Sequence, residues 1–101
     1  MGVTFWVCNR GDAMADENDI ARGVVQIANA NGGRCTYKRA YREIPNYVQL
    51  NAANKAPSQT RPGEPMWHQL VRNIKSHDKT PGNFIHDGKL VHLRGVGFRV
   101  P

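Results

Sequence analysis

The sequence predicts an α+β domain in which three helices are followed by a C-terminal β-hairpin. Apolar residues recur at helical spacing in three segments between residues 19 and 77, whereas the last twenty residues hold short apolar runs separated by Gly-containing turns. With 101 residues, of which 40% are hydrophobic, the chain can bury one core. It contains no run of 18 apolar residues, so we expect no membrane partner.

Residues 1–14 are expected to form a loosely attached N-terminal segment, ahead of a domain over residues 15–101. The apolar residues at positions 3, 5 and 7 alternate as in a short strand, but they are isolated from the patterns that follow. The sequence MADENDIARG, which begins at Met14, has the acidic and capped appearance of the beginning of a domain.

The first two helices are expected over residues 19–31 and 37–44, with a very short strand at 34–36 between them. Asp16 or Asn18 can cap the first helix, and Gly32 can close it. Pro45 is expected to kink the second helix or to begin a short further piece through residues 47–50. The residues that share one face are Ile20, Val24, Ile27 and Ala28 in the first helix, and Tyr37, Ala40, Tyr41 and Ile44 in the second.

A basic loop is expected at about residues 51–63, where small polar residues and two prolines show no periodicity. The third helix should begin at Glu64 or Pro65 and end near His77, because proline is favoured in the first turn of a helix. Its apolar stripe consists of Trp67, Leu70, Val71 and Ile74.

The C-terminal segment is expected to form strands at residues 83–86 and 90–93 around an Asp87-Gly88 turn, since Asp-Gly is a strong hairpin signal. A second turn at residues 94–97 then leads into a last strand at 98–100. In that strand Arg99 alternates with apolar residues, so its side chain should point away from the core.

Two motifs carry a resemblance to winged helix-turn-helix DNA-binding domains. The segment KLVHLRGVGFRV resembles the wing hairpin of response-regulator effector domains, in which a strand, an RGxGxR turn and an aromatic-containing last strand recur. The segment TRPGEPMWHQLVRNIKSH is similar, more loosely, to winged-helix modules of bacterial restriction-type proteins. The resemblance implies that Arg94 and Arg99 lie on or beside a wing that touches DNA. The long loop before the third helix departs from the response-regulator family, and regulation by phosphorylation is not implied.

The charge distribution indicates a polyanionic partner for the later part of the chain. The net charge is +6, but residues 1–33 hold two basic and four acidic residues, a net charge of −2, whereas residues 34–101 hold twelve and four, a net charge of +8. Together with this charge, the winged-helix resemblance and the polar face of the third helix imply sequence-selective binding of double-stranded DNA, by a small transcription regulator or by the DNA-reading module of a larger, restriction-associated protein.

The candidate interface residues fall into two groups. The polar face of the third helix has no acidic residue and carries side chains suited to base edges; the base-reading candidates are His68, Gln69, Arg72, Asn73 and Ser76. Basic residues elsewhere would contact phosphates, which supply affinity without sequence information; these candidates are Lys38, Arg39, Arg42, Lys55, Arg61, Lys75 and Lys79.

Two alternative functions use the same features. An RNA-binding component of a ribonucleoprotein would use the same charge, with bases stacked on the aromatic residues of YKRAYREIPNY. A winged-helix protein-interaction module would instead depend on an apolar surface patch, and charge reversal on the third helix would leave its function intact.

The sequence does not indicate catalysis. The four histidines do not have zinc-finger spacing, and the two cysteines, at positions 8 and 35, are far apart. There is no nucleophile elbow or phosphate-binding loop. We therefore expect a non-enzymatic, cytoplasmic protein with free thiols and without a metal or cofactor.

Overall fold

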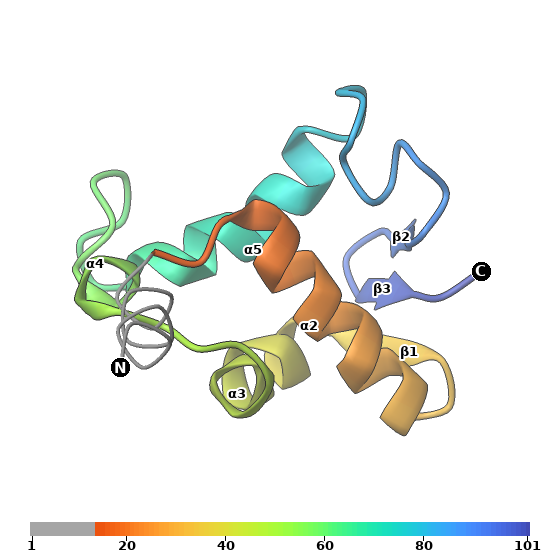
Figure 1. The fold of residues 1–101 in the computed structure, drawn as a ribbon, viewed down its shortest axis with the longest axis horizontal. Helices are drawn as coiled ribbons and strands as arrows, with labels where there is room; N and C mark the ends of the chain where they lie inside the picture. Colours follow the sequence, from red (N-terminus) through yellow and green to blue (C-terminus); the bar gives the residue numbers. More distant parts are fainter. Residues whose placement is uncertain (1–13) are drawn as a thin grey trace, which may run out of the picture.

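Four helices and a small three-stranded antiparallel sheet enclose the core in the computed structural model, which describes residues 14–101 (Figure 1). The elements are α2 (Glu17–Ala30), β1 (Arg34–Thr36), α3 (Tyr37–Tyr47), α4 (Ala52–Lys55), α5 (Met66–Ser76), β2 (Val91–Leu93) and β3 (Gly97–Arg99). The predicted α+β class is confirmed. The predicted loosely attached segment, residues 1–14, lies outside the described residues except for Met14, which is exposed.

Helix α2 begins two residues earlier than expected because Asp16 and Asp19 form a capping box. The Asp16 carboxylate accepts a hydrogen bond from the Asp19 amide at 2.8 Å, and the Asp19 carboxylate accepts one from the Asp16 amide at 2.9 Å. The predicted apolar face is confirmed, with Ile20, Val24 and Ile27 fully buried.

Helix α3 continues through Pro45 to Tyr47. Proline removes one intrahelical hydrogen bond, but it is exposed here while Ala40 and Ile44 are fully buried. Val48 is the C-cap: its backbone is extended, and its amide makes the last helical hydrogen bond, to the Ile44 carbonyl at 2.9 Å. Gly23 of α2 allows this close packing, because a Cβ at that position would lie 2.6 Å from Val48 Cγ2.

The segment expected to be a loop over residues 51–63 contains helix α4, so that prediction is wrong in part. Asn51 and Asn54 form a second capping box, a local arrangement that hydropathy periodicity does not reveal. Asn54 is fully buried, and its side chain also accepts a hydrogen bond from the Ala15 amide at 2.9 Å and donates one to the Ala15 carbonyl at 3.0 Å. This side chain therefore joins the segment before α2 to the segment before α5.

The Asn54→Ala variant should lower the free energy of unfolding by about 2–3 kcal/mol, because it leaves buried backbone groups of Ala15 without partners. Urea denaturation measures the change. Lys55→Ala, an exposed position in the same short helix, is the control and should change stability by less than about 0.5 kcal/mol. Equal effects of the two substitutions would contradict the role assigned to Asn54.

The sheet has the strand order β1-β3-β2, with Cys35, Phe98 and His92 side by side across it. The strand predicted at 34–36 is confirmed, and β2 and β3 lie within one residue of the strands predicted at 90–93 and 98–100. The turn between β2 and β3 is held against α3, because the Tyr37 amide donates to the Val96 carbonyl at 2.9 Å.

The predicted strand at residues 83–86, with its Asp87-Gly88 hairpin, is wrong. The Asn83 carboxamide oxygen accepts hydrogen bonds from the amides of Ile85 (2.8 Å) and His86 (3.1 Å), which folds the chain into consecutive turns. The side-chain nitrogen of Asn83 donates to the Ile74 carbonyl at 2.9 Å, and this contact attaches the turns to α5. The hairpin is instead formed by β2 and β3.

The core lies where α2, α3 and α5 meet the sheet. Helix α2 contacts α3, α5, β1 and β3, and Phe98 of β3 is fully buried among these elements. No helix within residues 14–101 combines the length and the apolar character that a membrane crossing requires.

Candidate nucleic-acid interface

Helix α5 turns one face to the core and the opposite face outward. Trp67, Val71 and Ile74 are buried, as the predicted stripe requires, whereas Leu70 is only partly buried. On the outward face the base-reading candidates Gln69, Arg72 and Asn73 are half-buried, and Ser76 is exposed.

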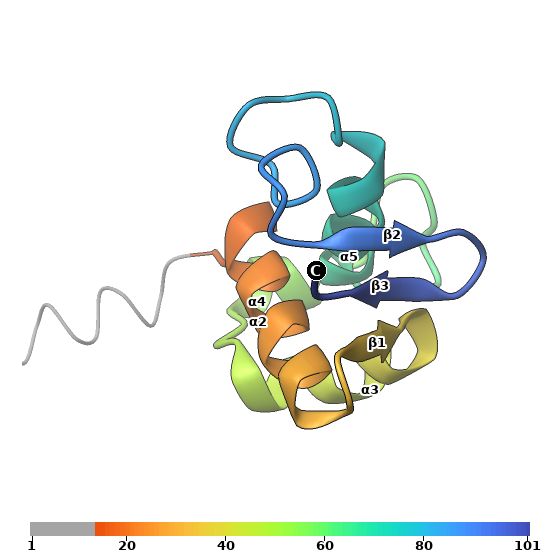
Figure 2. The ribbon, with the colours of Figure 1, turned by 90° about the vertical axis from the view of Figure 1, so that its right-hand side faces the viewer.

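Three segments project to one side of the molecule and surround α5. Figure 2 shows the β2–β3 turn, the loop before α5 and the beginning of α3 extending to the same side, with α5 between them. These segments carry Arg94, Arg61 and Lys38, respectively, and all three side chains are exposed. None of the three forms an ion pair with an acidic residue in the part of the chain that the structure describes. Their charges are therefore available to a polyanion. We call these three residues the basic rim.

Among the other phosphate-contact candidates, three form ion pairs with acidic residues of the described chain and two do not. Arg39 and Arg42 share Glu43, with N···O distances of 2.7 and 3.2 Å, and Lys75 pairs with Asp78 at 2.7 Å. Lys55 and Lys79 are exposed and have no ion pair among residues 14–101.

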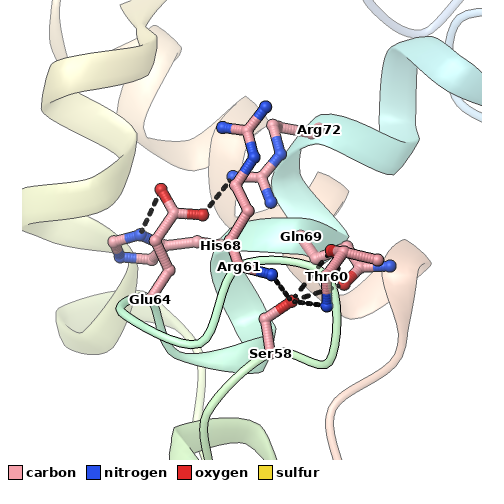
Figure 3. Close-up of polar contacts among 7 residues, drawn as sticks. All are labelled: Ser58, Thr60, Arg61, Glu64, His68, Gln69 and Arg72. Carbon is pink, nitrogen blue, oxygen red and sulfur yellow. Dashed lines mark hydrogen bonds and ion pairs between the residues drawn. The ribbon is translucent and has the colours of Figure 1, made fainter.

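Helix α5 itself carries no acidic residue, as expected, but the loop before it brings one against the outward face. An isolated antiparallel bridge between Pro57 and Pro65 closes the loop before α5, and this places Glu64 against the helix (Figure 3). The Arg72 guanidinium donates to the Glu64 carboxylate at 2.8 Å. This pairing arises from the path of the loop, so counting residues on the helix could not reveal it.

Gln69 is also held by the loop. Its side-chain oxygen accepts hydrogen bonds from the hydroxyls of Ser58 at 2.8 Å and Thr60 at 3.2 Å (Figure 3). Ser58 is only 2% exposed although it lies in a segment expected to be an open loop. Sequence reasoning missed both hydroxyl residues, because serine and threonine in a proline-containing loop are common and carry no distinguishing signal.

His68 is half-buried, and its ring packs against two other aromatic rings. Its ring stacks on Tyr41, with centroids 4.3 Å apart, and meets the edge of Trp67 at the same distance. Burial lowers the pKa of His68 more strongly than the nearby Glu64 raises it. Burial also lowers the pKa of His92, and Lys75 adds to this effect. His92 Nε2 lies 2.8 Å from the Tyr37 hydroxyl.

His68 and His92 should each have a pKa below the ordinary value of about 6.5 in an NMR titration that follows their ring proton shifts. A lowered folded-state pKa means that the folded protein binds fewer protons than the unfolded chain. The resulting stability is present above pH 6.5 and is lost as the pH falls through the lowered values. Titration of either ring above 6.5 in the folded protein would contradict these environments.

The two wing candidates differ in their surroundings. Arg94 is exposed in the turn, whereas Arg99 is half-buried in β3 and donates to the carbonyl of Val100 at 3.2 Å. Arg99 also lies opposite Arg34 in the β1–β3 register, so the two arginines are cross-strand neighbours.

Two findings concern metal binding and thiol chemistry in the described part of the chain. No cluster of three or more histidine, cysteine or acidic side chains suited to a metal ion occurs within residues 14–101. Burial raises the pKa of the Cys35 thiol to about 11, with Glu43 adding to the shift, and a thiol in that state is a poor nucleophile. Comparison of the chain with protein-family models, curated proteins and solved structures gives no match.

Proposed function

We propose that this domain binds double-stranded DNA with sequence selectivity. The observation that carries the proposal is the basic rim, three exposed cationic side chains without an ion pair among residues 14–101, on three segments that extend to the same side of the molecule as one another (Figure 2). An electrostatic contact to phosphates at several points around one helix is the arrangement that seats a helix in the major groove.

The order of the elements supports a winged helix-turn-helix interpretation. Helices α3 and α5 would form the helix-turn-helix pair, with an unusually long connection between them, and the β2–β3 turn would be the wing. In this interpretation α5 enters the major groove, Arg94 contacts the backbone or the minor groove beside it, and Lys38 and Arg61 contact phosphates.

The base-reading roles within α5 are then unequal. Gln69, Arg72 and Asn73 lie on the outward face, whereas His68 is stacked against Tyr41 and serves to position the helix. Truncation of Arg72 is expected to relax base preference, because its guanidinium can reach a guanine edge when it leaves Glu64.

Duplex DNA binding is tested by fluorescence anisotropy over a range of salt concentrations. The proposal predicts binding whose logarithmic affinity falls linearly with the logarithm of salt concentration, with a slope set by the number of phosphates contacted. Absence of binding at low ionic strength would overturn it. Competition with single-stranded and duplex RNA distinguishes an RNA-binding protein, for which RNA would displace the DNA completely.

The Glu64→Gln variant should bind duplex DNA about five- to tenfold more tightly than the wild type. The substitution removes a negative charge from the interface and frees the Arg72 guanidinium from its ion pair. Glu43→Gln is a matched control, because it removes the same charge from α3, where it frees Arg39 and Arg42, and leaves the Glu64–Arg72 pair intact. A larger gain for the control would place the binding face on α3 instead of α5.

A further inference from the structure

The hydroxyl of Ser58 has all of its hydrogen-bonding capacity assigned. Its oxygen accepts hydrogen bonds from the backbone amides of Thr60 at 3.2 Å and Arg61 at 3.3 Å, which occupy its two lone pairs. Figure 3 shows these contacts meeting at the Ser58 oxygen. The hydroxyl proton is therefore left to donate, and two oxygens lie within reach, Gln69 Oε1 at 2.8 Å and the Thr60 hydroxyl at 3.1 Å. The contact to Gln69 is the shorter, and we assign the proton to it.

This assignment fixes the orientation of the Gln69 carboxamide. Only the carbonyl oxygen of the amide can accept a proton from Ser58, so Oε1 faces the loop and Nε2 faces away from it. The Thr60 hydroxyl, at 3.2 Å, can donate to the same oxygen. With two donors the lone pairs of Oε1 are filled, whereas Nε2 forms no hydrogen bond within residues 14–101.

We infer that Gln69 is a specificity-determining residue that presents only hydrogen-bond donors to DNA, and that it therefore selects guanine over adenine. This inference rests on the proposed function. A free glutamine reads adenine by donating to N7 and accepting from N6, and the second bond needs Oε1. Guanine offers the acceptors N7 and O6 instead, so a glutamine whose oxygen is occupied matches guanine.

Selection from a randomised duplex library tests the base preference. The position read by Gln69 is identified as the one whose preference disappears in Gln69→Ala. At that position the wild type should prefer guanine over adenine by roughly tenfold, which is within the range for one good base contact. The Ser58→Ala/Thr60→Val double variant frees Oε1 and should move the preference toward adenine. Thr60→Val alone keeps the buried Ser58 contact and should produce a smaller shift.

The Gln69→Glu variant keeps the hydrogen-bond acceptor of the side chain and removes its donor. A carboxylate still accepts from Ser58 and Thr60 but has no donor, so the melting temperature should remain near that of the wild type while the guanine preference is lost. Adenine preference in the wild type, or an unchanged preference in the double variant, would overturn the inference.

The amide orientation has a readout that needs no DNA. The ¹³Cδ chemical shift of Gln69 reports the hydrogen bonds to its carbonyl, and it should move in Ser58→Ala. If duplex DNA is not bound but this shift moves, the proposed function fails while the orientation stands. If the shift does not move, the inference about Gln69 fails, whether or not DNA is bound.

Discussion

The Gly97→Ala variant should lose about 4 kcal/mol or more of the free energy of unfolding, a large part of the stability of a domain of this size. A Cβ at this position would overlap the Cys35 carbonyl oxygen and would lie 2.7 Å from Thr36 Cα. These are backbone atoms of the neighbouring strand, so they cannot move aside without separating β1 from β3. The φ angle of +152° is also one that residues with side chains rarely adopt.

Thermal unfolding followed by circular dichroism measures this effect, and the melting temperature should fall by at least about 15 °C. The control is Gly95→Asn in the adjacent turn. Gly95 also has a positive φ of 73°, but a Cβ there would meet no atom within 4 Å, and asparagine tolerates this conformation. A similar loss in both variants would show that turn conformation, and not the close approach of β1 to β3, limits stability.

The Lys38→Ala/Arg94→Ala double variant should bind duplex DNA about a hundredfold more weakly at low salt. Each side chain is exposed and free of acidic partners, and a charge-assisted contact to phosphate contributes about 1.4 kcal/mol or more, which is roughly tenfold in affinity. The slope of logarithmic affinity against logarithmic salt concentration should also become smaller by about two. Sequence preference should remain, because phosphate contacts do not distinguish bases.

The matched control for this variant is Arg22→Ala/Lys89→Ala, which also removes one arginine and one lysine. Arg22 lies on α2, where it pairs with Asp19, and Lys89 lies over the Phe84 ring, outside the three projecting segments. Only a change of a few-fold is expected, from the general loss of positive charge. If the control weakens binding as strongly as the double variant, the attraction is due to net charge and not to the basic rim.

The helical part of the fold could be predicted from the sequence because its signals are local. The acidic cap of α2, the apolar stripe of α5 and the short β1 strand depend on residues within one or two turns of the chain. Helix α4 was not predicted, because its four residues show no hydropathy period and only the Asn51–Asn54 capping box marks its start. Its anchoring depends on a contact between Asn54 and Ala15, which lie 39 positions apart. No periodicity can reveal such a contact.

The misplaced hairpin has a comparable cause. Asp87-Gly88 does form part of a turn, but the residues before it are held by the Asn83 side chain and by its contact with the Ile74 carbonyl of α5. A local turn signal does not tell whether the flanking residues form a ladder. Strand β3, in contrast, pairs with β1, which lies about sixty residues earlier, and β2 pairs with β3.

The candidate site could be predicted in composition but not in its internal contacts. The positive charge of the later part of the chain and the polar face of α5 follow from the sequence. The contacts of that face follow only from the path of the loop before α5, which places Glu64 beside Arg72 and Ser58 beside Gln69. These contacts decide which side chains are available, so they determine what the face can recognise.

Chemical-shift mapping of the ¹⁵N-labelled protein with a short duplex tests the central claim most directly, since it reports the binding face residue by residue. We predict shifts at the three segments of the basic rim and on the outward face of α5, at Gln69, Arg72 and Asn73, and little change around Arg22 on α2. An unchanged spectrum at low ionic strength, or shifts that gather on α2 instead, would contradict the account.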